Sequence, residues 1–189
     1  MEKRHRIFIA INLPNDIKRE LFSYSDKWLD LPAKWTAKDN LHITLEFLGD
    51  LTDEEIGDVC LATKEVAERN TGFSLNLNQV TYGPPKKMPP KFVWAIGEKS
   101  NELTNLRKDL EESVAKKVSF VPEERAFAPH ITLARISSFG FKAIEPEERP
   151  EINETIDLQF TVESIEVMES ELRREGPVYT ILESHQFKP

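Results

Sequence analysis

The tetrapeptide His-Ile-Thr-Leu occurs at His42–Leu45 and again at His130–Leu133, and the two copies use two of the four histidines in the chain. Apolar and polar residues alternate in each copy, which is typical of a strand with one buried face. The His and the Thr of each copy therefore share the face opposite the buried one. Two such strands brought together would offer two imidazoles and two hydroxyls, which suits a phosphate site with one acid and one base.

The sequence on either side of the two motifs predicts strands that are separated by a few helices. Strand patterns are expected at 6–13, 34–37, 42–48, 73–80, 92–96, 131–136, 158–167 and 178–187. Apolar residues at helical spacing indicate a helix that starts at Pro14 and reaches Leu29, a second that starts at Thr52, and a third over 103–114. The strand alternation changes phase near Glu163, which predicts a bulge or turn there. Separate strands with few helices favour an α+β fold over a doubly wound parallel sheet.

Each half of the chain contains an extended approach, a motif strand and a helix, which suggests an internal duplication. We therefore expect residues 1–189 to form one bilobal domain, in which two mainly antiparallel lobes face each other across a groove. No low-complexity segment or linker divides the chain into independent domains.

Composition narrows the class of protein. The chain is 39% hydrophobic and 31% charged, as expected for a globular protein, and it has no apolar run near 18 residues that could span a membrane. A single Cys rules out a disulfide framework, and the apolar stretch Ile7–Leu13 is too short for a signal peptide, so a cytoplasmic protein is expected. The net charge of −8 argues against binding along a nucleic acid, but a single terminal phosphate needs only a local positive site.

The duplicated histidines have two other interpretations, which are a structural role and a metal site. A single histidine is more often structural than catalytic, and duplication could also copy a structural histidine. A zinc site needs three or four ligands at spacings that this chain lacks. Glu46, which strict alternation places on the His42 face, could complete a two-histidine metal site, but Ala134 stands at the matching position of the second motif. We therefore expect no metal.

Other residues whose side chains could take part in catalysis or binding are interpreted as structural. Cys60 lies on an apolar helix stripe, which indicates a small core residue rather than a nucleophile. Trp35, Trp94 and Phe92 are assigned to the core, because large aromatic residues fill cores more often than they stack on bases. The basic loop at 84–91 (PPKKMPPK) is expected either to be solvated or to flank an RNA groove.

The chain resembles the two-histidine phosphoesterases, and within them the RNA 2′,3′-cyclic phosphodiesterase branch, historically called 2′-5′ RNA ligase. Six stretches carry the resemblance in the same order along nearly the full chain. They are RIFIAINLP, KWTAKDNLHITLEFLGDL, VTYGPP, FVWAIGE, FAPHITLARI and VESIEVMESELRREGPVYTILESHQF. One His-x-Thr motif alone is a weak signal, whereas two with these flanking sequences are specific.

The resemblance implies a fold, an activity and a catalytic pair. The two motif strands would line the central groove, with the helices on the outside. The enzyme would hydrolyse a terminal ribose 2′,3′-cyclic phosphate to a 2′-phosphate without a metal or other cofactor. The catalytic residues would be His42, as the acid at the departing 3′ oxygen, and His130, which would activate water or contact the phosphoryl oxygens. The hydroxyls of Thr44 and Thr132 would bind phosphoryl oxygens.

The resemblance also implies a base-stacking role for Phe47 and a phosphate contact for Arg135, each five residues after its histidine. Strict alternation places both side chains on the face opposite the histidines, so these roles require a bulge, a strong twist or a strand end. Relatives often carry a basic or polar residue where this chain has Ala128, which leaves Arg125 as a candidate substitute.

Two rival functions stay open. One is a related enzyme that acts on another cyclic nucleotide or on a 2′-5′ linkage, including ligation of RNA ends by the reverse reaction. The other is a non-catalytic module that binds RNA ends, although binding alone does not need two proton-transfer groups. The expected partners are RNA ends or nucleotides that carry a cyclic phosphate, with no membrane, and the protein is expected to be a monomer.

Overall fold

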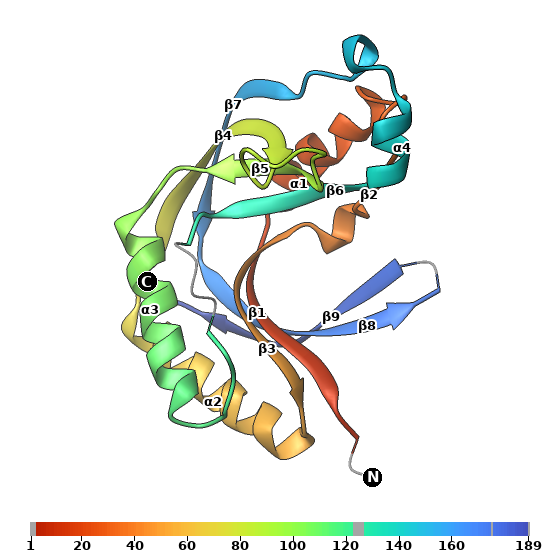
Figure 1. Ribbon diagram of the computed structural model, residues 1–189. Coiled ribbons are helices and arrows are strands. Elements are labelled where there is room, and N and C mark those ends of the chain that lie inside the picture. Colours follow the sequence, from red (N-terminus) through yellow and green to blue (C-terminus); the bar gives the residue numbers. More distant parts are fainter. Residues whose placement is uncertain (1–2, 123–126, 175, 189) are drawn as a thin grey trace.

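Two antiparallel sheets, one above the other in Figure 1, form the body of the computed structural model, which describes residues 3–122, 127–174 and 176–188. The first sheet has the strand order β3 (His42–Leu51), β1 (His5–Asn12), β8 (Ser164–Arg173) and β9 (Gly176–Gln186). The second sheet has the order β2 (Ala33–Trp35), β6 (His130–Ile136), β5 (Phe92–Gly97), β4 (Phe73–Gly83) and β7 (Asn153–Val162). The expected α+β fold is confirmed.

The strand β1 shows how alternation divides the apolar residues. Ile7, Ile9 and Ile11 are fully buried in the main hydrophobic core. Phe8 and Ala10 point to the opposite face, where they form a separate small apolar cluster with a methionine of β8. Because β1 lies inside the first sheet and is buried on both faces, its second face can support functional groups on the neighbouring strands.

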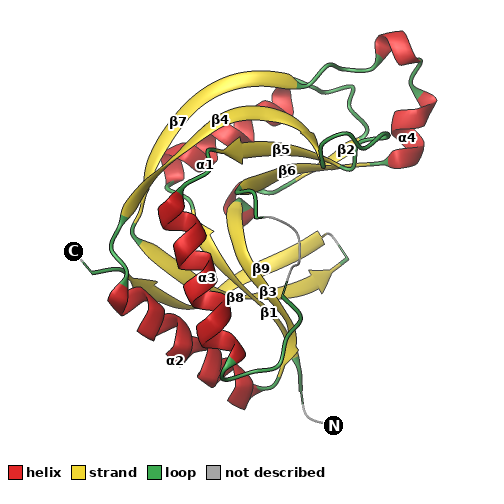
Figure 2. Cartoon of the chain, turned by 60° about the vertical axis from the view of Figure 1, so that its left-hand side comes forward, coloured by secondary structure: helices red, strands yellow, loops and turns green. Residues whose placement is uncertain are grey.

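Two helices, α2 (Asp53–Arg69) and α3 (Asn101–Ala115), pack against each other and against strands of the first sheet, as Figure 2 shows. The predicted helix start at Thr52 is confirmed, because its hydroxyl accepts the Glu55 N–H and the Glu55 carboxylate accepts the Thr52 N–H. None of the helices in the described ranges is long and apolar enough to cross a membrane.

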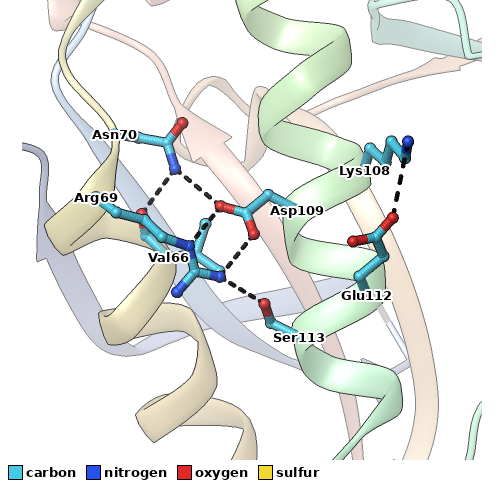
Figure 3. Close-up of polar contacts among 7 residues, drawn as sticks. All are labelled: Val66, Arg69, Asn70, Lys108, Asp109, Glu112 and Ser113. Atoms are coloured by element: carbon cyan, nitrogen blue, oxygen red, sulfur yellow. Dashed lines mark hydrogen bonds and ion pairs between the residues drawn. The ribbon is translucent and has the colours of Figure 1, made fainter.

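A polar cluster joins α2 to α3 (Figure 3). Arg69 donates to the Asp109 carboxylate from Nε at 2.8 Å and from Nη2 at 2.6 Å, and Nη2 also donates to Ser113 Oγ at 2.6 Å. Asn70 Nδ2 donates to Asp109 and to the Val66 carbonyl. The guanidinium holds the pKa of the Asp109 carboxyl below its ordinary value, so the pair is ionised at neutral pH.

The two sheets do not correspond to the two halves of the sequence. The first sheet joins β1 and β3 from the N-terminal half to β8 and β9 from the C-terminal end, and the second sheet takes β2 and β4 to β7. Each sheet nevertheless receives one motif strand, β3 or β6. The internal duplication is therefore interleaved, because the last two strands return to the first sheet.

Two local expectations need correction. The helix α1 (Asn15–Phe22) ends well before Leu29, whose side chain is 79% exposed. A short helix, α4 (Ser138–Ala143), has no counterpart among the predicted elements, because six residues are too few for a clear helical stripe.

The predicted break near Glu163 is confirmed, since β7 ends at residue 162 and β8 begins at residue 164.

Candidate active site

The two motif histidines occupy equivalent places, because each is the first residue of its strand. His42 Nδ1 lies 2.7 Å from the carbonyl oxygen of Asn40, and His130 Nδ1 lies 2.9 Å from that of Ala128. A carbonyl oxygen only accepts hydrogen bonds, so in both rings Nδ1 carries the proton. Nε2 is then the nitrogen that can take up or release a proton in each imidazole.

The motif threonines share the faces of their histidines. Thr44 Oγ1 lies 2.9 Å from His42 Nε2, so the hydroxyl and the exchangeable nitrogen form one hydrogen-bonding unit. Thr132 is half-buried on β6 and pairs in register with Trp94 of β5. Strand alternation therefore explains these positions without special geometry.

A β-bulge in each motif strand changes the alternation three residues after the histidine. On β3, Thr44 pairs with Ala10 and Glu46 pairs with Ile9, which leaves Leu45 as the extra residue. The two bulged residues both point into the core, so the next side chain returns to the face of the motif histidine. Phe47 is that side chain, and its ring is 60% exposed.

The second motif repeats this bulge. On β6, Thr132 pairs with Trp94 and Ala134 pairs with Val93, so Leu133 is the extra residue. Arg135 therefore returns to the face of the motif histidine and is exposed. The requirement for a bulge is met in both strands, and one bulge follows each His-x-Thr motif at the same position.

Aromatic rings surround His42 on the first sheet. The ring of Phe8 lies 5.1 Å from that of His42 and 5.9 Å from that of Phe47, measured between centroids. Tyr179 of β9 meets both His42 and Phe8 edge-on, at 5.2 Å. Neither Phe8 nor Tyr179 was among the predicted site residues. The signal for Phe8 was its alternation with the buried isoleucines of β1.

A different row of rings lies beside His130 on the second sheet. Trp94 lies 4.1 Å from His130, Phe92 stacks on Trp94 at 5.9 Å, and the Arg135 guanidinium lies 5.3 Å from the Phe92 ring centre. The assignment of Phe92 and Trp94 to the core was wrong. They alternate with the buried Val93, so the period-two pattern of β5 already placed them on the opposite face.

The chain matches a known protein family over most of its length. The family model described as LigT like Phosphoesterase matches residues 11–94 and 96–179, so it covers both motifs. The chain belongs to the LigT like phosphoesterase family. The two separate matches agree with the duplicated motif strands.

Two family relatives match over most of their length. RNA 2′,3′-cyclic phosphodiesterase of Aquifex aeolicus is 31% identical over 162 residues, which cover 82% of each chain. The Thermus thermophilus protein of that name is 31% identical over 194 residues, covering 97% of this chain and 90% of the relative. Among solved structures, TT0787 of Thermus thermophilus has a TM-score of 0.83 at 28% identity, with 96% and 97% coverage. Escherichia coli LigT complexed with 3′-AMP has a TM-score of 0.78 at 25% identity, with 99% and 100% coverage.

In this LigT-like site, the pKa of His42 on the first sheet depends in part on a group of the second sheet. Burial lowers the pKa of His42, the charges of Lys18 and His130 lower it further, and the hydrogen bond to the Asn40 carbonyl opposes these effects. The motif strands β3 and β6 contact each other, so the two histidines lie in one region of the molecule. Across the sheets, Arg135 counteracts the rise that burial causes in the pKa of Tyr179.

Glu46 does not share the face of His42, so the metal alternative that used it was wrong. The bulge turns Glu46 into the interior, where it is 3% exposed and its Oε2 lies 3.4 Å from Arg107 Nη2. Within the described ranges, no three or more His, Cys, Asp or Glu side chains cluster as metal ligands would. Cys60 is buried, as predicted. Arg125 lies outside the described residues.

Proposed function

We propose that this chain hydrolyses the terminal 2′,3′-cyclic phosphate of RNA to a 2′-phosphate, with His42 and His130 as its proton-transfer groups. The matched histidine geometry carries this proposal: both rings are held through Nδ1 by a backbone carbonyl, which leaves both Nε2 atoms for chemistry. The names of the family relatives support the substrate class. Because the site takes side chains from both sheets, residues 1–189 would act as one catalytic domain.

The reaction needs one base and one acid. His130 Nε2 takes a proton from water as the water oxygen bonds to phosphorus. The bond from phosphorus to the ribose 3′ oxygen breaks, and His42 Nε2 donates a proton to that oxygen, which leaves a 3′-hydroxyl and a 2′-phosphate. An imidazole has an ordinary pKa of about 6.5, so both roles are available near neutral pH. Burial lowers the pKa of His42 in the free site, and the negative charge of a bound phosphate opposes this effect by favouring the protonated form. Each proton transfer typically contributes about 10²- to 10⁴-fold to the rate.

The remaining motif residues would hold the substrate. The hydroxyls of Thr44 and Thr132 donate hydrogen bonds to phosphoryl oxygens, and the permanent charge of Arg135 stabilises the negative charge that develops on them. The exposed ring of Phe47, supported by Phe8, offers a surface on which the terminal base stacks. These groups supply proton transfer and charge stabilisation, so we propose that the reaction needs no metal or nucleotide cofactor.

The proposal is tested with a short RNA that ends in a 2′,3′-cyclic phosphate, incubated in EDTA with wild type, His42→Ala or His130→Ala. We expect a 2′-phosphate product from wild type and a rate lower by about 10²-fold or more in each variant. His5→Ala is the matched control, because His5 contacts Glu169 and Asp53 at the opposite end of β1 from Asn12, the residue that pairs with His42. Full activity in both motif variants, or loss of wild-type activity in EDTA, would contradict the proposal.

A further inference from the structure

Two cations face each other across neighbouring strands of the second sheet. Lys34 of β2 pairs in register with Arg135 of β6, and both side chains are exposed. Residues directly opposite in an antiparallel pair share one face, with Cβ atoms about 4.5 to 5.5 Å apart. Two positive charges at this spacing raise the local potential, which attracts an anion to this part of an otherwise acidic chain. Since Arg135 shares the face of His130, Lys34 does so as well.

An open cavity of about 420 Å³ surrounds this cation pair. Its lining consists of Pro32, Ala33, Lys34, Arg135, Ile136 and Ser137. The cavity lies at the end of β6, whereas His130 begins that strand. Arg135 lines the cavity and shares the face of His130, so the cavity adjoins the place where the reacting phosphate would bind and is open to a group farther along the substrate.

The hairpin formed by β8 and β9 of the first sheet approaches the second sheet at Lys34. A Cβ atom on Gly176 would lie 3.1 Å from Lys34 Nζ, so the hairpin backbone passes close to the lysine. Asn40 Nδ2 also donates to the Pro177 carbonyl at 2.9 Å, which ties the hairpin to the segment before β3. Figures 1 and 2 both place the end of β8 and the start of β9 on the side of the molecule that carries β2 and α4.

We propose that Lys34 forms a second phosphate subsite, which binds the phosphodiester that joins the terminal nucleotide to its 5′ neighbour. The proposal rests on the function proposed above. Arg135 lies on the same strand as His130, whereas Lys34 lies on the neighbouring edge strand β2, one strand away from His130. The subsite makes a dinucleotide or longer RNA end a better substrate than a cyclic mononucleotide.

The test compares a 2′,3′-cyclic mononucleotide with a dinucleotide that ends in the same cyclic phosphate. We expect Lys34→Ala to lower kcat/KM for the dinucleotide by about 5- to 20-fold, as is typical for loss of one charged phosphate contact, and to change the mononucleotide value by less than about twofold. Lys64→Ala on α2 is the matched control, because Lys64 is an exposed lysine whose loss changes the net charge equally.

Binding of the two reaction products separates the subsite from the catalytic proposal. Dissociation constants are measured for a nucleoside 2′-phosphate and for a dinucleotide with a terminal 2′-phosphate. Weaker binding of only the dinucleotide by Lys34→Ala supports the subsite even if wild type hydrolyses neither cyclic substrate, which would refute the catalytic proposal alone. Equal losses for both ligands, or no loss for either, would overturn the subsite.

Discussion

His42 and His130 begin identical tetrapeptides, but their surroundings differ. Phe8 and Tyr179 surround the His42 ring, whereas Trp94 lies against the His130 ring at 4.1 Å. Two identical local sequences thus become two chemically different imidazoles. Such a difference suits an acid and a base, because the two groups must differ in protonation state when the substrate binds.

The partial burial of His42 predicts a dependence of stability on pH. Burial lowers its pKa in the folded protein from the ordinary value of 6.5, while the unfolded chain keeps the ordinary value. Between the two values the unfolded state binds more protons, so the stabilisation is complete above about 6.5 and is lost as the pH falls through the folded pKa. The midpoint of thermal unfolding should therefore fall more steeply from pH 7.5 to 5 in wild type than in His42→Asn. Parallel curves would contradict the lowered pKa.

At the scale of elements, the bulges on β3 and β6 determine which side chains reach the site. Without them, Phe47 and Arg135 would enter the core, and Glu46 would join the histidines. Arg107 of α3 supports the bulge on β3, because its Nε donates to the Leu45 carbonyl at 3.2 Å. A helix beside the sheet thus satisfies a backbone carbonyl at the bulge of this edge strand.

Packing between β4 and β5 holds Trp94 in place, which predicts a severe effect of Gly83→Ala. A Cβ atom at Gly83 would overlap the Trp94 ring, so the indole would have to leave its place beside His130. We expect a loss of about 1 to 3 kcal/mol in the free energy of unfolding, and lower kcat on the cyclic phosphate. Urea denaturation and steady-state kinetics provide the two measurements.

Gly57→Ala is the matched control for this substitution. No atom lies within 4 Å of a Cβ at Gly57 in α2, and alanine favours a helix over glycine by up to about 1 kcal/mol. This control should therefore raise stability and leave kcat unchanged. If Gly83→Ala behaves like the control, Trp94 does not depend on the absence of that Cβ.

At the scale of the whole molecule, a net charge of −8 limits contact with RNA to a few phosphates at the site. Lys34 and Arg135 are the cations that carry the proposed contacts. For two phosphate contacts with a single strand, the logarithm of the dinucleotide association constant should fall with the logarithm of salt concentration with a slope of roughly −1 to −2. A slope steeper than about −4 would indicate a broad basic surface instead.

The sequence alone determined the faces of the strands and the candidate pair of histidines. Alternation depends on local backbone geometry, so the burial of Ile43 and the half-exposed positions of His42 and Thr44 could be predicted from neighbouring residues. The same local signals located the helix start at Thr52. The flanking sequences also identified the family, since they extend along nearly the whole chain.

Only the tertiary structure decided which strands pair and where their registers shift. A bulge arises when two particular strands are aligned, so neither motif could reveal the return of Phe47 and Arg135 to the histidine face. The pairing of β2 with β6 likewise brings Lys34 opposite Arg135, although the two residues are about a hundred positions apart in the sequence. Long-range pairing places these charges together because it minimises the free energy of the entire core, which no short segment encodes by itself.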